Sequence, residues 1–547
     1  MSHQPSHTVG ATEPALLDET IGACLDRITA AHGDRDAIVV PFQDVHWTYT
    51  ELRDEVDRLA RALLAAGFAK GDRLGIWSPN NVEWVTTQLA TARIGVIMVC
   101  INPAYRTHEV QYALAQSGCK GLVAATSFKT SDYVGMIDEV RGDLPDLEQV
   151  YWIGTDDWPA LLAKADEVSA DQLAEVSGGL AANDPINIQY TSGTTGYPKG
   201  ATLTHRNILN NGFFVGEACH YTEADRVNIP VPLYHCFGMV MGVLGCLTHG
   251  AAMVFPAPSF EPVATLEATA NQRCTSLYGV PTMFIAQLGE AGFADYDLTS
   301  LRTGIMAGSP CPIEVMKQCV DQMHMDEVTI AYGMTETSPV STQTSPDDPL
   351  EKKVGTVGRV LPHIEIKVVD PETGETVPRG TSGEFCTRGY SVMQGYWNDP
   401  ERTADAIDAD GWMHTGDLAV MDDEGYANIV GRIKDMVIRG GENVYPREIE
   451  EFLYSHPNIR DVQVIGVPDA KYGEEVAAWV QTEDGAELTA EEVKEFCKGK
   501  IAHYKVPRYV IVTEEFPMTV TGKIQKFKLR DAAVEQLGLT DQERVTA

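Results

Sequence analysis

Two hydrophobic periods alternate along most of the chain. The segment 49–64 carries apolar residues at the spacing of an amphipathic helix. Short apolar runs between such helical segments have the length of buried strands, at 73–77 (RLGIW), 95–101 (GVIMVCI), 121–125 (GLVAA), 251–255, 275–278 and 328–332. Strands that alternate with helices predict an α/β fold of layered sheets with helices on both faces.

The pattern changes toward the C-terminus. From Glu365 short strands are separated by turns such as PETGE and DDEGY, which predict a β-rich subdomain of hairpins. After Arg432 a compact α+β pattern follows, with strands at 461–467 and 509–513 and helices near 491–501 and 526–535. A segment of about 110 residues can fold alone. We predict a loose tail (1–14), a large N-terminal domain (15–432) and a small C-terminal domain (433–547).

Composition narrows the classes of partner. The chain has 547 residues and a formal net charge of −36, and a polyanion repels nucleic acid and anionic membranes. The longest apolar stretch, within 237–247, is shorter than the roughly 20 residues of a membrane span. The 11 cysteines form no C-x-x-C pair, and the N-terminus shows no signal-peptide pattern. We expect a cytoplasmic protein without stable membrane insertion, whose oligomeric state, a homodimer among the options, stays open.

A glycine- and hydroxyl-rich loop is the most informative segment. The strand pattern at 186–190 runs into 191–200 (TSGTTGYPKG). Glycines let backbone N–H groups approach a ligand, hydroxyls donate hydrogen bonds and a lysine adds charge, so this composition favours phosphate binding over an ordinary polar loop. It matches neither the Walker nor the Rossmann pattern. The predicted phosphate-binding residues are Thr191, Ser192, Gly193, Thr194, Thr195, Gly196 and Lys199.

The loop resembles the signature of the adenylate-forming (AMP-binding) superfamily, and further motifs follow in the family's order from Trp47 to Lys523. The resemblance implies that Tyr332 and Gly333 contact adenine, together with Gly308 and Ser309. It also implies that Thr335 contacts the α-phosphate and that Glu336 holds Mg²⁺ together with Thr195. A hard cation that bridges phosphates prefers such oxygen ligands.

The resemblance extends to the ribose and to the junction between the domains. Asp417, in 411–417 (GWMHTGD), is implied to accept hydrogen bonds from ribose hydroxyls, although an isolated Asp beside Gly more often marks a turn. Arg432 is implied to reach the nucleotide and Lys434 to be the hinge. The loop at Gly440, Gly441 and Glu442 is implied to face coenzyme A, with a simple glycine turn as the alternative.

Lys523 lies in the last motif, 516–523 (FPMTVTGK). The resemblance implies that it bridges the carboxylate and the α-phosphate, where a positive charge eases the approach of two anions. Basic residues are frequent between Lys494 and Arg530, which suggests either a positive patch that attracts ATP and coenzyme A or a solvated helix face.

The segment 232–238 (PLYHCFG) resembles the part of the family beside the acyl group. Amino-acid-activating relatives carry an Asp there, and its absence here predicts an uncharged acyl group with His235 near the carbonyl. The glycines of 238–245 indicate either close helix packing or a channel for an alkyl chain.

The segments 331–340 (AYGMTETSPV) and 354–360 (VGTVGRV) are most similar to medium-chain acyl-CoA synthetases. The resemblance implies an ATP-dependent, AMP-forming ligase for medium- to long-chain fatty acids that uses Mg²⁺ and coenzyme A. Because the chain ends soon after Lys523, we expect a separate thiol acceptor. An acyl-AMP ligase that loads a carrier protein and a coenzyme A ligase for an aromatic or short branched acid remain alternatives. A nucleotide sensor without turnover is disfavoured because Lys523 and Glu336 are both present.

Overall fold

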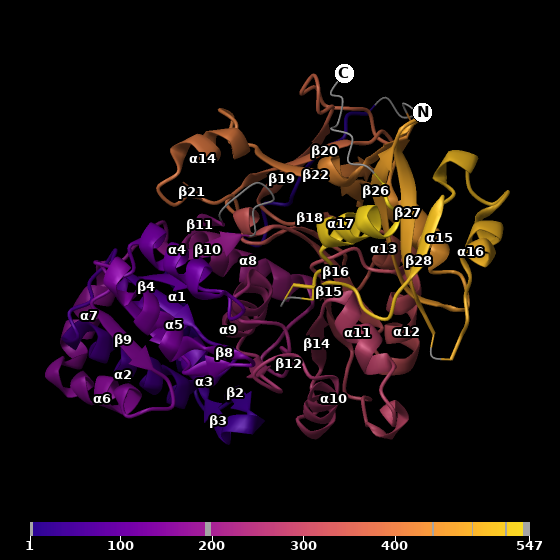
Figure 1. Cartoon of the computed structure of the whole chain (residues 1–547). Coiled ribbons are helices and arrows are strands. Elements are labelled where there is room, and N and C mark those ends of the chain that lie inside the picture. The colour runs from indigo at the N-terminus through magenta and orange to yellow at the C-terminus, as the bar shows by residue number, and fades with distance from the viewer. Residues whose placement is uncertain (1–3, 192–197, 440–441, 484, 520–521, 540–547) are drawn as a thin grey trace.

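A computed structural model describes residues 4–191, 198–439, 442–483, 485–519 and 522–539 (Figure 1). Two large sheets form the centre of the N-terminal part, as expected for layered α/β sheets, and both are rich in parallel strands. The seven-stranded sheet has the order β21 (Gly395–Tyr396), β11 (Lys199–Thr204), β10 (Pro185–Thr191), β5 (Ile97–Cys100), β4 (Arg73–Trp77), β6 (Gly121–Ala124), β9 (Gln149–Trp152). The nine-stranded sheet has the order β18 (Arg359–Val360), β17 (Val340–Gln343), β16 (Glu327–Gly333), β15 (Thr303–Ala307), β14 (Ser276–Gly279), β12 (Arg226–Asn228), β13 (Ala252–Val254), β2 (Asp36–Val40), β3 (Val45–Thr48).

Helices surround these sheets and join them. Helix α2 begins after a capping box in which Thr48 and Glu51 satisfy each other's backbone N–H groups, so its start is fixed locally. Helix α3 is buried along nearly its whole length, as expected for a helix enclosed by other elements. The helices of this part are α1 (Ile21–His32), α2 (Tyr49–Ala65), α3 (Val82–Ile94), α4 (Thr107–Ser117), α5 (Tyr133–Val140), α6 (Asp157–Ala163), α7 (Ala170–Gly178), α8 (His205–Ala218), α9 (Gly245–His249), α10 (Pro262–Asn271), α11 (Pro281–Leu288), α12 (Ile313–Met323), α13 (Leu350–Gly355) and α14 (Pro400–Ala406).

A third, antiparallel sheet is the predicted β-rich subdomain. Its order is β1 (His7–Val9), β19 (Ile364–Val369), β20 (Gly383–Gly389), β22 (Met413–Met421), β23 (Ala427–Arg432). In place of a loose tail over residues 1–14, His7–Val9 pair with Glu365–Lys367. The free edge of β19 offers unpaired backbone groups, and the tail satisfies them.

The C-terminal part is a separate five-stranded sheet with three helices, shown in yellow in Figure 1. Strands β25 (Glu442–Val444), β24 (Val437–Arg439), β27 (Gly473–Thr482) and β26 (Ile459–Asp469) follow one another, and β28 (Tyr509–Val512) pairs with β27. The helices are α15 (Pro446–Leu453), α16 (Ala490–Cys497) and α17 (Lys526–Gln536). In the N-terminal part, β7 (Ser127–Phe128) and β8 (Ser131–Asp132) form a further short hairpin. Among the described residues, none of the helices combines the length and apolar composition that a membrane span requires.

Candidate active site

The ends of β16 and β23 and the middle of β22 bring the predicted nucleotide residues together. Tyr332 lies near the end of β16 and donates a hydrogen bond from its hydroxyl to Asp417 Oδ2 over 2.7 Å. Arg432, at the end of β23, donates from Nε to Asp417 Oδ1 over 3.1 Å. Burial raises the pKa of Tyr332 well above its usual value, so the phenol stays a donor. The structure therefore places the adenine and ribose candidates in direct contact.

An irregularity in β22 sets the position of Asp417. In the pairing of β20 with β22, Glu384 lies opposite Leu418 and Cys386 lies opposite His414. Residues 415–417 are therefore bulged, and Gly416 adopts a positive φ of 71° that suits glycine. The hydroxyl of Thr415 donates to Phe385 O over 2.6 Å and accepts from the N–H of Asp417 over 3.1 Å.

Glu336 lies in the short 3₁₀ turn that follows β16 and is buried. Its Oε1 accepts hydrogen bonds from the hydroxyl of Tyr396 over 2.8 Å and from that of Thr191 over 3.4 Å. In the described part of the chain these hydrogen-bond partners are neutral, and a buried carboxylate with neutral partners fits a hard cation. Thr335 is also buried, and its hydroxyl interacts with the thiol of Cys236.

The phosphate loop connects two paired strands. Thr191 of β10 lies directly opposite Lys199 of β11, and Lys199 Nζ lies 4.9 Å from the centre of the Tyr396 ring. Thr191 thus contacts Glu336 directly, and Lys199 lies over the ring of Tyr396, whose hydroxyl also binds Glu336. The predicted residues Ser192, Gly193, Thr194, Thr195 and Gly196 lie outside the described residues.

Lys523 reaches this site from the C-terminal sheet. Its loop is closed by Thr519, whose N–H donates to Lys523 O over 2.7 Å and whose hydroxyl accepts from Lys523 N over 3.1 Å. The loop contacts the N-terminal part, where the hydroxyl of Thr282 donates to Gly522 O over 3.4 Å. Burial, followed by the charge of Arg432, lowers the pKa of Lys523. Asp417, Cys236 and Glu336 act on the same amine in the opposite direction, so the predicted catalytic lysine faces both halves of the nucleotide site.

His235 completes the centre of the site. Its Nδ1 accepts the backbone N–H of Phe237 over 3.1 Å, so a neutral ring carries its proton on Nε2. Burial, followed by the charge of Lys523, lowers the pKa of His235 to about 3. The imidazole is therefore a neutral hydrogen-bond donor and a weak base.

Several predicted glycines act through close packing. A side chain at Gly333 would clash with Pro339 O, and Gly308 has a φ of 91° and lies beside the Lys523 side chain. Along the buried π-helix Phe237–Leu244, a Cβ on Gly238 would lie 2.5 Å from Pro232 O. A Cβ on Gly242 would lie 3.1 Å from Ile229, so the glycine edge is filled by packing. This supports the close-packing alternative for 238–245.

The remaining predicted residues lie in three different segments of the chain. Lys434 is exposed in the 3₁₀ turn Ile433–Asp435, which connects β23 to β24. Ser309 is half-buried next to Gly308. Glu442 is exposed at the start of β25, while Gly440 and Gly441 lie outside the described residues.

Ion pairs neutralise part of the basic stretch between Lys494 and Arg530, which argues against a free positive patch over its whole length. Lys526 Nζ lies 2.5 Å from Glu450 Oε1, and Arg508 Nη1 lies 2.8 Å from Asp469 Oδ2. Other members of the stretch also have acidic partners, among them Lys505 with Glu448 and Lys498 with Glu495. At least four of the nine basic residues between Lys494 and Arg530 therefore have acidic partners within the C-terminal part.

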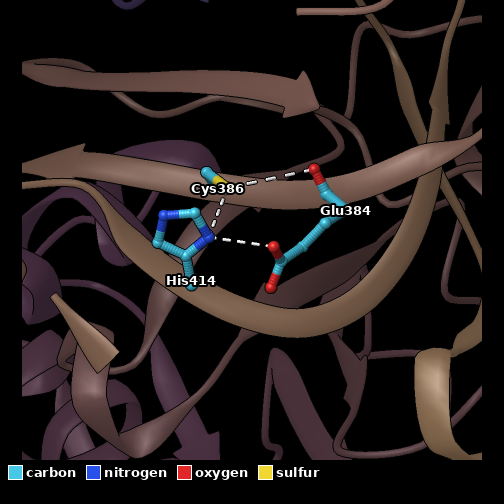
Figure 2. A group of neighbouring side chains, drawn as sticks. All are labelled: Glu384, Cys386 and His414. Atoms are coloured by element: carbon cyan, nitrogen blue, oxygen red, sulfur yellow. Dashed lines mark hydrogen bonds and ion pairs between the residues drawn. The ribbon is translucent and has the colours of Figure 1, made fainter. Parts of the chain in front are cut away.

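Sequence reasoning missed Glu384. Figure 2 shows it beside Cys386 and His414, with its carboxylate 2.9 Å from His414 Nδ1. Donor atoms of the three residues lie within 4.8 Å of one another, a spacing that also suits a metal. However, burial raises the pKa of the Cys386 thiol to about 12, and Lys367 lies directly opposite Cys386 in β19. We therefore interpret the group as a hydrogen-bonded cluster.

Comparison with known proteins identifies the family of the chain. The family model "AMP-binding enzyme" matches residues 25–397, and "AMP-binding enzyme C-terminal domain" matches 448–523. The protein YngI of Bacillus subtilis (strain 168) is 48% identical over 544 residues, with 96% of this chain and 99% of the relative covered. The medium-chain acyl-CoA ligase ACSF2, mitochondrial, of Mus musculus is 44% identical, with 98% and 91% covered. Because this relative is named as a mitochondrial protein, the cytoplasmic location of the present protein stays a prediction.

Solved structures show the same fold over almost the full length. The anthranilate CoA ligase AuaEII in complex with anthranoyl-AMP superposes with a TM-score of 0.85 at 27% identity, covering 96% of this chain and 99% of that one. The Mycobacterium tuberculosis fatty acyl CoA synthetase superposes with a TM-score of 0.72 at 31% identity, covering 94% and 99%. The chain therefore belongs to the AMP-binding enzyme family, on its acyl-CoA synthetase branch.

Proposed function

We propose that the protein is an AMP-forming acyl-CoA synthetase for medium- to long-chain fatty acids. The observation that carries the proposal is the convergence of Lys523 with Asp417, Glu336 and His235 at one point. The first half-reaction joins the carboxylate to the α-phosphorus of ATP and releases pyrophosphate. In the second, the thiolate of coenzyme A attacks the acyl carbonyl, and AMP leaves.

The ribose and adenine are held at the strand ends. Asp417 offers two carboxylate oxygens, each with room for a further hydrogen bond beside those from Tyr332 and Arg432. The ring of Tyr332, Gly333 and the turn at Gly308 and Ser309 line the adenine side.

The phosphates lie between the loop and the lysine. Thr335 and Lys523 contact the α-phosphate, where the amine offsets the repulsion between two anions. The loop from Thr191 to Lys199 holds the pyrophosphate that leaves. Glu336, with Thr195, would hold Mg²⁺, which neutralises phosphate charge when bound.

The acid is held beside His235. Its neutral Nε2–H can donate to the carboxylate without adding a charge, and the segment 232–238 has no acidic residue to receive an ammonium group. An uncharged acyl group is therefore favoured.

The second half-reaction needs a different arrangement of the C-terminal part. Lys434 sits in the turn between β23 and β24, where a backbone rotation would move Lys523 away. The loop at Gly440, Gly441 and Glu442 would then face coenzyme A.

An aromatic acid is the second candidate substrate, because the superposition with AuaEII has the higher TM-score of the two compared here. Pyrophosphate release should be measured with Mg·ATP across straight-chain acids from C2 to C18 and aromatic acids. Thioester formation should be compared between coenzyme A and a phosphopantetheinylated carrier protein. Highest activity with C6 to C16 acids and coenzyme A supports the proposal. Highest activity with aromatic acids, or with the carrier protein, would replace it.

A further inference from the structure

The bulge at residues 415–417 interrupts the regular pairing of β22 with β20, although Asp417 pairs with Arg432 of β23 on the other side, so side chains must hold the bulge toward β20. Gly416 has a positive φ, and its N–H donates to a side chain, Glu384 Oε1, over 3.0 Å. The other oxygen of the same carboxylate accepts from His414 Nδ1 over 2.9 Å. One carboxylate thus binds the residue before the bulge and the residue at its centre.

The surroundings of Glu384 hold its side chain and that of His414 in fixed positions. Its side chain is 13% exposed. The ring of His414 is also fixed, since its Nε2 lies 3.6 Å from Asp408 Oδ2. Asp408 in turn accepts the backbone N–H of Trp412 over 2.9 Å, so both ends of the segment 412–416 are tied to acidic side chains.

We propose that Glu384 is a positioning residue that sets the Asp417 carboxylate for the ribose hydroxyls. The inference rests on the proposed role of Asp417 in ribose binding. Glu384 touches neither ATP nor the acid in this account. It acts because Asp417 directly follows Gly416, so a shift of the bulge would move the carboxylate away from Tyr332 and from the ribose.

In this proposal, the contacts of Glu384 with Gly416 and His414 act as hydrogen bonds more than as charge interactions. In Glu384→Ala the N–H of Gly416 loses its acceptor, whereas in Glu384→Gln the amide oxygen can still accept from Gly416. The amide NH₂ can then donate to Nδ1 of the other His414 tautomer. Glu384→Gln should therefore rescue most of what Glu384→Ala loses.

The test compares ATP with 2′,3′-dideoxy-ATP in pyrophosphate release by the full chain. The ratio of kcat/KM for ATP to kcat/KM for 2′,3′-dideoxy-ATP measures the contribution of the ribose hydroxyls. The ratio found for Asp417→Ala is the lowest value expected. We expect Glu384→Ala to reduce the ratio by about tenfold. Its activity on dideoxy-ATP should stay near that of the unchanged protein, and Glu384→Gln should keep the ratio within about threefold. Glu365→Ala is the matched control, because Glu365 lies in the same sheet and pairs with Arg388.

Thr415→Val is a second variant, in case Glu384→Ala does not fold. It removes the other brace of the bulge and should reduce the same ratio. Equal losses on both nucleotides in Glu384→Ala or Thr415→Val, or a reduced ratio in Glu365→Ala, would overturn the inference. A ratio near one in the unchanged protein would remove the ribose role of Asp417 and the inference with it. Absence of pyrophosphate release with every acid would instead refute the proposed activity.

Discussion

The two ends of the candidate site are built differently. At the ribose end, Tyr332 of the nine-stranded sheet and Arg432 of the antiparallel sheet that contains β22 and β23 both bind the Asp417 carboxylate. Side chains also hold the bulge at residues 415–417. At the other end, the Lys523 loop meets the N-terminal part through a 3.4 Å hydrogen bond from Thr282 and through packing of Gly522 near Val280. In the proposed mechanism, the group needed in both half-reactions is embedded in sheets, whereas the group needed only in the first lies on a loop at the boundary between the two parts of the chain.

The first and largest test of this difference is Lys523→Ala. Loss of the amine should slow acyl-AMP formation by about 10²–10³-fold, because the repulsion between carboxylate and phosphate is no longer offset. Conversion of supplied acyl-AMP and coenzyme A to thioester should be unchanged. Pyrophosphate release and thioester formation are measured separately, with the exposed Lys528→Ala as control. Equal losses in both half-reactions would contradict the proposal that the C-terminal part takes a different arrangement in each half-reaction.

Asp417→Ala should lower both half-reactions. Acyl-AMP carries the same ribose as ATP, so removal of the carboxylate should reduce kcat/KM for ATP and for acyl-AMP by about 10–100-fold each. Steady-state kinetics with each substrate checks this. An effect on ATP alone would show that the ribose end is also rearranged between the half-reactions.

Glu451→Ala probes one of the contacts between the C-terminal part and the N-terminal part. The Glu451 carboxylate interacts with the N–H of Ile313 at the start of α12, a helix without a side-chain cap of its own. Removing this cap should slow acyl-AMP formation about fivefold and leave thioester formation unslowed. Single-turnover measurements of each half-reaction test it, and Glu448→Ala, which breaks a pair within the C-terminal part, is the control. Equal changes in both variants would argue against a docking role.

The smallest effect concerns pH. The pKa of Lys523 is lowered by burial and then by Arg432, so its charged form is lost at a lower pH than for an ordinary lysine. The kcat/KM for ATP should therefore fall as pH rises through a midpoint below about 10.5. Arg432→Gln should move that midpoint upward, toward the ordinary value. If the residual activity of Lys523→Ala shows the same fall with rising pH, the group that titrates is not Lys523.

Local patterns predicted much of the fold. The segment 49–64 is α2 because apolar spacing and the Thr48–Glu51 capping box agree, and 73–77 is β4 because a buried parallel strand is continuously apolar. The edge strand β1 was missed, because three residues gain their structure only from β19. The bulge was missed for a similar reason. The contact of Glu384 with Gly416 joins residues 32 positions apart through an irregular register.

Motifs located the candidate site better than charge did. Residues such as Tyr332, Asp417 and Lys523 are far apart in sequence, yet the structure brings them together. In the stretch from Lys494 to Arg530, residues from elsewhere in the sequence neutralise part of the positive charge, as Glu450 does for Lys526. Local charge says little about an electrostatic surface when the neutralising residues lie on other strands.

The pairing of Thr191 with Lys199 has a consequence for how such enzymes diversify. The ladder fixes both ends of the loop, and the side chain at each position alternates between the faces of the sheet. Inserting one residue in either strand would turn Lys199 away from Tyr396 and Glu336. The segment 232–238, which we propose lies beside the acyl group, belongs to other elements, so substitutions there leave this register intact. On the proposed function, the acid can thus be changed by mutation of one region while the handling of phosphate is inherited unchanged.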